Sequence, residues 1–329
     1  MDIFTHILMG TLPCFLLLFK ISPEAIIFLW IMAIFPDIDI FVDPFTKKRN
    51  LYFLSHKAAS HSYIIGIMIT GILSLPISLL RGVPFYEIWL FGVIGFSIHL
   101  SLDFFGASKI PIFYPFSKKE FRVIADRAIN PILALFSGIN LLILIIYYFI
   151  KPYYHVFMLL TSFYIYTYLI YFGIKLTLRI IVQIRLEKHQ QYIPGILPFF
   201  YFIYEKSANQ EGIIIKLTKK FAFSSKRKEI INHHIIKNSE SMLYFELAEK
   251  VSQEYRFFHK WSSIIPFFQY EDNFIHVVLI LAESYFHSSS YFLSIIFEKD
   301  THLIKYREEG FGSFKKWKDK NLLGTHSTN

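Results

Sequence analysis

The sequence predicts an α-helical membrane domain of about five to six transmembrane or re-entrant helices, residues 1–180, followed by a small α+β soluble domain, residues 188–329. Hydrophobic residues make up 54% of the chain and charged residues only 18%, whereas soluble domains have roughly 45–50% and 25%. This excess is concentrated, because residues 131–176 contain only Lys151, His155 and Lys175 as titratable groups other than tyrosines. Residues 176–329, in contrast, have ordinary polar content.

Apolar runs define the candidate spans. A full crossing needs about 20 residues. The runs lie at residues 3–19, 23–35, 63–80, 84–104, 131–150 and 153–174. The second run is too short to cross alone, so the first two are expected to form a tilted or re-entrant hairpin that turns at Ser22 and Pro23.

The basic residues then assign the sides of the membrane. If the segments cross or return in turn, residues 1–6, 36–62, 104–130 and everything after 174 share one face. That face carries most of the Lys and Arg residues of the first 185 positions, whereas the opposite turns carry only Lys20, Arg81 and Lys151. The positive-inside rule makes it cytoplasmic. We therefore expect a multi-pass protein of the inner (cytoplasmic) membrane with its C-terminal domain in the cytoplasm.

The net charge of +9 fits topology and anionic lipid better than nucleic acid, which is not an expected partner. Membrane lipid is the expected partner. Anionic headgroups have two candidate binding segments, residues 47–49 and 118–122, although positive-inside anchoring alone explains both equally well.

The C-terminal part mixes strand and helix patterns. Basic residues between Lys175 and Lys188 alternate with Leu and Ile, which predicts a helix that leaves the bilayer along its cytoplasmic surface. The alternative is that this segment is only the end of the last span. Apolar residues recur at helical spacing from Leu243 to Phe258. Runs rich in Ile, Val, Phe and Tyr predict strands at residues 212–217, 274–282, 291–297 and 303–306.

Imidazole and carboxylate groups interrupt the apolar segments at their ends. Because these ends come from four segments, the topology places the whole set at one depth on the cytoplasmic face. The set is His6, Asp37, Asp39, His56, His61, His99 and Asp103. His99 and Asp103 are spaced i, i+4 and so share a helix surface.

A divalent cation explains these groups better than separate structural roles. A single intramembrane histidine is usually structural, but ionisable groups at membrane depth cost about 2.5–3.5 kcal/mol each, which argues against chance for the whole set. Asp37, Asp39 and Asp103 end helices, where a carboxylate is disfavoured by about 0.3–1 kcal/mol unless a cation compensates it. The only cysteine, Cys14, excludes a thiolate zinc site. The set exceeds one tetrahedral site, so one or two ions are expected, zinc first and manganese as the alternative.

At these residues the chain resembles the membrane-bound metal-dependent hydrolase family of bacteria and archaea. The resemblance rests on motifs in the same order: Asp-x-x-Thr-His-x-x-x-Gly at Asp2–Gly10, Pro-Asp-x-Asp at Pro36–Asp39, the histidine motif His56–Ser62, His-x-x-x-Asp at His99–Asp103, and Pro115-Phe116. Residues 247–258 are similar to the tail of longer members. The chain departs from the pattern at Lys57, Ala58 and Ser60, and at Asn130, where an Asp is expected and Asp126 is the nearby substitute.

The resemblance implies a membrane-bound hydrolase. Together with the residues, it predicts cleavage of an ester or phosphoester of a lipid or other amphiphile by metal-activated water, with Asp37, Asp39 or Asp103 as catalytic carboxylates. The alternative is a non-catalytic metal-binding membrane protein or a transporter. An intramembrane metalloprotease is disfavoured because no His-Glu-x-x-His motif occurs.

Overall fold

The computed structural model describes residues 2–17, 21–39, 57–128, 130–149, 154–224, 226–286 and 289–314. The chain divides into two compact units, Met1–Leu178 and Arg179–Asn329. Each unit is described by itself below.

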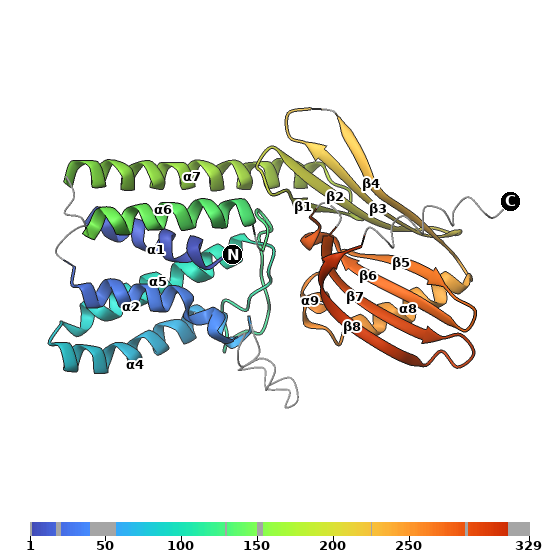
Figure 1. Ribbon diagram of the computed structural model, residues 1–329, viewed down its shortest axis with the longest axis horizontal. Coiled ribbons are helices and arrows are strands. Elements are labelled where there is room, and N and C mark those ends of the chain that lie inside the picture. Colours follow the sequence, from blue (N-terminus) through green and yellow to red (C-terminus); the bar gives the residue numbers. More distant parts are fainter. Residues whose placement is uncertain are drawn as a thin grey trace. The chain divides into compact units, whose positions relative to one another are not determined.

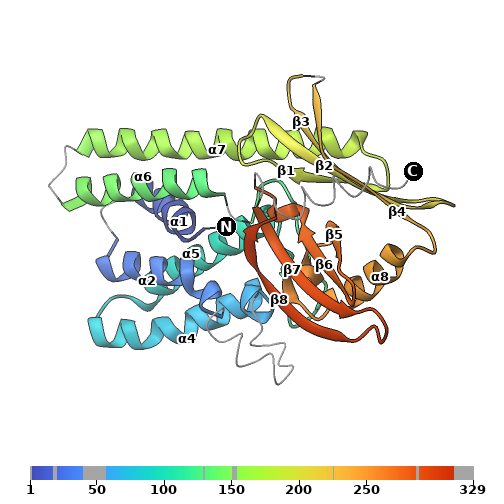
Figure 2. The ribbon, with the colours of Figure 1, turned by 45° about the vertical axis from the view of Figure 1, so that its right-hand side comes forward.

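The first unit is helical (Figure 1). Its α-helices are α1 (Ile3–Leu17), α2 (Pro23–Ile34), α4 (Tyr63–Arg81), α5 (Phe85–Phe105), α6 (Pro131–Phe149) and α7 (Tyr154–Arg185). Two 3-10 helices are short: η1 (Phe35–Ile38) directly follows α2, and η4 (Ala59–His61) directly precedes α4. Helix α1 lies beside α6 in both views (Figure 1 and Figure 2).

Within the described residues, three helices are long and apolar enough to cross a membrane: α4, α5 and the part of α7 from His155 to Arg185. The sequence predicted five to six transmembrane or re-entrant helices. Apolar stretches in α1 and α6 are shorter. Helix α2 has 12 residues, which at about 1.5 Å per residue span about 18 Å, against a hydrocarbon core of about 30 Å.

Helix α2 begins at the predicted turn. The Ser22 hydroxyl accepts a hydrogen bond from the backbone N–H of Ala25 at 3.3 Å, and Pro23 occupies the first turn. The N–H of Ser22 donates to Glu87 of α5 at 2.7 Å. The start of α2 is therefore fixed both by its own N-cap and by α5.

Helix α5 packs closely against both α2 and α4 because glycines stand at the crossings. A Cβ at Gly95 would lie 2.4 Å from the carbonyl oxygen of Leu29, and one at Gly66 would lie 2.1 Å from the ring of Phe96. The backbones of α2 and α5 therefore touch one helical turn before His99.

Helix α7 corrects a predicted boundary. The sequence placed the end of the last span at residue 174 and left two readings for the residues after it, a helix along the membrane surface or the end of that span. In the structure α7 is one continuous helix of 32 residues. The side chain of Lys175 is 1% exposed and forms an ion pair with Asp126 at 2.9 Å. The basic residue that suggested a membrane surface is therefore buried against the loop between α5 and α6.

The second unit is dominated by strands. Two four-stranded antiparallel sheets each follow chain order, and α8 (Glu240–Ser252) and α9 (Arg256–Lys260) connect them. The first sheet holds β1 (Gln190–Pro194), β2 (Phe200–Ala208), β3 (Gly212–Phe221) and β4 (Arg227–Ile236). The second holds β5 (Ile264–Tyr270), β6 (Phe274–Leu281), β7 (Ser289–Glu298) and β8 (Ile304–Ser313).

The two sheets are joined by polar and aromatic contacts. The hydroxyl of Tyr204 donates to the carbonyl of Ile264 at 2.8 Å, and the rings of Phe202 and Tyr285 lie 5.5 Å apart. The predicted strands correspond to β3, β6, β7 and β8, whereas β1, β2, β4 and β5 were not predicted.

Candidate metal centre

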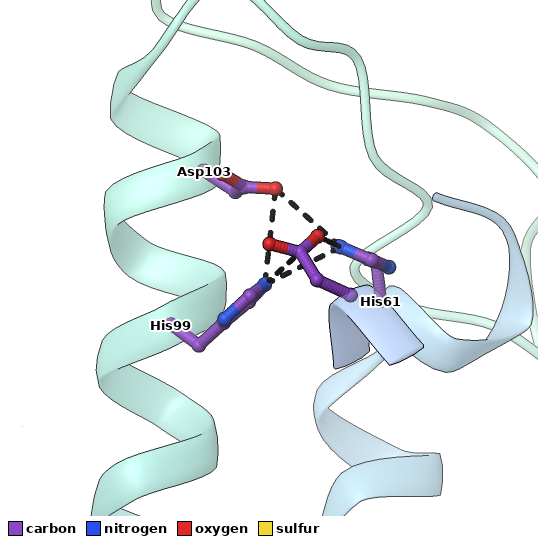
Figure 3. A group of neighbouring side chains, drawn as sticks. His61, His99 and Asp103 are labelled. Carbon is purple, nitrogen blue, oxygen red and sulfur yellow. Dashed lines mark hydrogen bonds and ion pairs between the residues drawn. The ribbon is translucent and has the colours of Figure 1, made fainter. Parts of the chain in front are cut away.

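Four predicted ligands meet at one point. Asp37, His61, His99 and Asp103 each offer one donor atom, and these atoms all lie within 4.8 Å of one another. The Nε2 atom of His61 is 3.4 Å from Asp103 Oδ2, 3.5 Å from Asp37 Oδ1 and 3.4 Å from His99 Nε2. Figure 3 shows His61 from η4 pointing toward His99 and Asp103 on α5.

A backbone contact sets the orientation of His99. Its Nδ1 lies 2.7 Å from the carbonyl oxygen of Ala33 on α2. Since a carbonyl only accepts, Nδ1 carries the hydrogen and Nε2 presents its lone pair to the group of four. The close approach of the backbones at Gly95 makes this contact possible.

A hydroxyl and a carboxylate orient His61 in the same way. The His61 Nδ1 lies 3.0 Å from Ser60 Oγ, and Ser60 Oγ donates to Asp39 Oδ2. The backbone N–H of Lys57 also donates to Asp39 Oδ2, at 2.9 Å. Asp39 therefore lies behind His61 and fixes the turn that carries it, in the manner of carboxylates that support metal-binding histidines.

Lys57 adds a cation that sequence reasoning did not assign to the site. Its Nζ lies 2.5 Å from Asp103 Oδ2, and its side chain is 13% exposed. Burial alone lowers the pKa of Lys57, but Asp103 and Asp37 outweigh it and the net shift is upward. The signal in the sequence is its place inside the histidine motif His56–Ser62.

The neighbouring carboxylates also change the pKa of His61. Burial lowers the pKa of His61, but the neighbouring carboxylates of Asp103, Asp37 and Asp39 raise it overall to about 9. For Asp37, burial raises the pKa, but protonated His61, with Nε2 3.5 Å from Asp37 Oδ1, and the charge of Lys57 bring it well below its usual range. In the metal-free protein the carboxylates are thus balanced by protonated His61 and by Lys57.

His6 lies beside the group of four. Asp2 caps α1 by accepting from the backbone N–H of Thr5 at 2.9 Å, and the Thr5 hydroxyl bonds to Ser137 of α6 at 2.8 Å. One residue further on, the ring of His6 stacks on His99 with 4.0 Å between centroids. Its Nε2 is 3.7 Å from Asp103 Oδ1.

Buried nitrogen and oxygen atoms that lack a hydrogen bond indicate whether a metal ion fits this group. Among the residues that the structure describes, both ring nitrogens of His6 and the Oδ1 of Asp37 are buried without a hydrogen-bond partner. Leaving such atoms unsatisfied costs about 1–3 kcal/mol each. Because the four donors are two imidazole nitrogens and two carboxylate oxygens, these residues fit a divalent cation such as zinc or manganese.

The remaining predicted residues are accounted for as follows. His56 and the basic residues 47–49 lie outside the described residues. In the second basic segment, Lys119 Nζ lies 5.4 Å from the ring centre of Phe121, and Arg122 donates to the carbonyl of Ala107 at 3.2 Å.

The substitute carboxylate Asp126 has a structural role. It accepts from Lys175 Nζ at 2.9 Å and from Tyr171 at 2.7 Å. Asn130, which stands where an Asp was expected, accepts from the backbone N–H of Leu133 at 3.3 Å and so caps α6. Neither residue is a member of the candidate metal-binding group.

The comparisons with known proteins place these observations in a family. The model of the YdjM inner membrane protein family matches residues 1–177, which include every member of the candidate metal centre. Its description names a location and no activity. No curated protein and no solved structure matches the chain. The chain belongs to the YdjM inner membrane protein family.

Proposed function

We propose that this protein is a membrane-bound hydrolase that cleaves an ester or phosphoester of a lipid or another amphiphile. The observation that carries the proposal is the convergence of Asp37, His61, His99 and Asp103, with donor atoms within 4.8 Å, at the end of the apolar helix α5. A site at a helix end lies at the depth where an amphiphile presents its polar headgroup.

The ligands proposed for one divalent ion are the three fully buried members: His61, His99 and Asp103. Three protein ligands leave one position for water, which is typical of catalytic zinc sites. An ion bound there would lower the pKa of water toward about 7 and polarise the scissile bond.

Asp37 is the proposed proton acceptor. Its side chain is 32% exposed, so it lies on the accessible side of the group. Its Oδ1 has no hydrogen bond within the described part of the chain and lies 3.7 Å from His99 Nε2. An ion bound to His61 would remove the proton that keeps the pKa of Asp37 low, so this carboxylate could then take a proton from a water molecule in the open position.

Lys57 and Asp39 are proposed as supporting residues. The Nζ of Lys57 lies 2.5 Å from Asp103 Oδ2, so it brings a positive charge next to the proposed ligands and would favour a substrate with an anionic oxygen. Asp39 holds the backbone N–H of Lys57 and the Ser60 hydroxyl, and therefore positions His61. We propose the cytoplasmic face for this site, from the distribution of Lys and Arg.

The test combines metal analysis with a substrate screen on the full chain purified in detergent. We expect His99→Ala to lose the bound ion and Asp37→Asn to keep it while losing hydrolysis of phospholipids, phosphoesters or carboxylesters. His234→Ala, an exposed histidine of β4, is the matched control and should change neither.

Two outcomes would overturn parts of the proposal. A protein with full metal occupancy and no hydrolysis in the screen would be a metal-binding membrane protein or transporter. Loss of the ion in Asp37→Asn would make Asp37 a ligand, and another group would have to accept the proton.

A further inference from the structure

The end of the β3–β4 hairpin carries exposed aromatic side chains together with exposed Arg227 and Lys228 and half-buried Lys219 and Lys220. Phe223 is 90% exposed and Phe221 is 39% exposed. They are flanked by four cations of the same two strands. We call these six residues the hairpin tip: Lys219, Lys220, Phe221, Phe223, Arg227 and Lys228.

The cations of the hairpin tip oppose one another across the sheet. Lys219 pairs with Lys228, and Lys220 pairs with Arg227. Like charges directly opposite each other in an antiparallel pair destabilise it. In the part of the chain that the structure describes, none of the four forms an ion pair with a carboxylate. The hairpin therefore carries a repulsion that an anionic partner would relieve.

The aromatic side chains are held in place beside these cations. The Nζ of Lys219 lies 4.2 Å from the ring centre of Phe200 and 5.4 Å from that of Phe221. The backbone N–H of Ala222 donates to the carbonyl of Phe199 at 2.8 Å, which ties the turn to the neighbouring strand end. The ring of Phe199 is itself 44% exposed.

We infer that the hairpin tip binds the surface of an anionic lipid bilayer. Each Lys or Arg near such a surface is attracted by about 1 kcal/mol, or roughly fivefold in binding. An exposed Phe gains by inserting into the interface between headgroups and acyl chains. The inference is independent of the proposed hydrolysis, because it concerns the second unit alone.

A lipid surface is favoured over nucleic acid by the connection to the membrane. The strands of the second unit follow directly after α7, which is long and apolar enough to cross a bilayer. This connection keeps the second unit near the membrane and raises its effective concentration there. Phe223, which is 90% exposed at the tip, is also purely apolar.

The experiment places an environment-sensitive fluorophore next to the tip in the full chain. Cys14 is replaced by Ser and Ser224→Cys is labelled, since Ser224 is exposed in the turn beside Phe223. The matched control is Gln210→Cys, an exposed position at the opposite end of β3. Both proteins are reconstituted in nanodiscs of phosphatidylcholine with or without phosphatidylserine.

We expect the fluorescence emission of the label at position 224, and not of that at 210, to shift to the blue in phosphatidylserine nanodiscs. Lipids with a spin label in the acyl chain should quench the emission of the label at position 224 only. Lys220→Gln with Arg227→Gln should lower the ratio of bound to free tip by about fivefold for each charge removed. Phe223→Ser should reduce the quenching. Added salt should reverse the shift without any substitution.

Three results would overturn the inference. They are an equal emission of position 224 in both lipid compositions, a shift that appears at position 210 as well, and a shift that requires added RNA or DNA instead of anionic lipid.

Discussion

The imidazole of His99 donates a hydrogen bond from Nδ1 to the carbonyl oxygen of Ala33, 2.7 Å away. This contact joins α5 to α2 and leaves Nε2 directed at Asp103 and His61. The tautomer of a ligand is thus determined by how closely two helices approach each other. Helix packing and metal affinity should therefore be coupled.

Substitution of Gly95 tests this coupling. A Cβ at Gly95 would lie 2.4 Å from the carbonyl oxygen of Leu29, so Gly95→Ala must push α5 away from α2. We expect Gly95→Ala to weaken metal binding about 10–100-fold, as loss of a partner behind a ligand does. Isothermal titration with zinc measures the change. Gly173→Ala is the control because no atom lies within 4 Å of its Cβ, and equal affinities of the two variants would contradict the coupling.

Metal binding should release a proton. The pKa of His61 is raised from 6.5 to about 9, so the metal-free folded protein keeps that proton until the pH passes about 9. An ion that takes Nε2 must displace it. Zinc affinity should fall roughly tenfold for each pH unit below about 9.

Titration of zinc in buffers of different ionisation enthalpy counts the released protons. The same shift adds stability to the metal-free protein that is complete below pH 6.5 and is lost as the pH rises through about 9. An affinity that is constant across this window would show that His61 is neutral before metal binds.

Removal of the carboxylate behind His61 should loosen its turn. Asp39 accepts from the N–H of Lys57 and from Ser60, so Asp39→Ala frees both groups. We expect zinc affinity to fall about 10–100-fold while some hydrolysis remains at saturating zinc. Complete loss of hydrolysis with normal zinc affinity would instead assign Asp39 a catalytic role.

The buried pair of Asp126 and Lys175 should be important for stability and not for metal binding. Asp126→Ala leaves a buried ammonium without its carboxylate, which costs about 3–5 kcal/mol. The thermal midpoint of the detergent-solubilised protein should drop, and the double variant with Lys175→Met should recover part of it. Loss of bound zinc in the folded double variant would show that Asp126 acts in the site.

The sidedness proposed from the basic residues can be tested by labelling introduced cysteines in intact cells, in a protein in which Cys14 is replaced by Ser. Tyr86→Cys, at an exposed position in the first turn of α5, should react with a membrane-impermeant maleimide. Lys118→Cys, exposed in the loop between α5 and α6, should react only after permeabilisation. Reaction of position 118 in intact cells would reverse the assigned orientation.

The candidate site was accessible to sequence reasoning because its chemistry is unusual for its surroundings. Imidazoles and carboxylates at the ends of apolar runs are costly, so Asp37, His61, His99 and Asp103 could be selected by residue type and position alone. Which of the carboxylates would bind the ion and which would support a histidine could not be predicted from the sequence. Whether Asp39 faces the group or stands behind His61 depends on the turn at Lys57, whose backbone has a φ of 55°.

The fold was less predictable where local pattern and tertiary packing disagree. Strand β5 contains Pro266, which weakens a strand prediction, and β4 opens with Arg227, Lys228 and Glu229. The end of the last span was misplaced because Lys175 looks like a surface residue until Asp126 is brought to it. An ion pair between residues far apart in the sequence, such as Lys175 and Asp126, produces no periodic pattern that a sequence could show.

The ion pair between Lys57 and Asp103 has a consequence for how the protein is made. A site with three neighbouring carboxylates would resist insertion into a bilayer if it had to wait for its metal with those charges uncompensated. Lys57 lies 2.5 Å from Asp103, and His61 carries a proton up to pH 9 or so. The nascent chain therefore brings its own counter-cations, and we expect its helices to assemble whether or not a metal ion is bound.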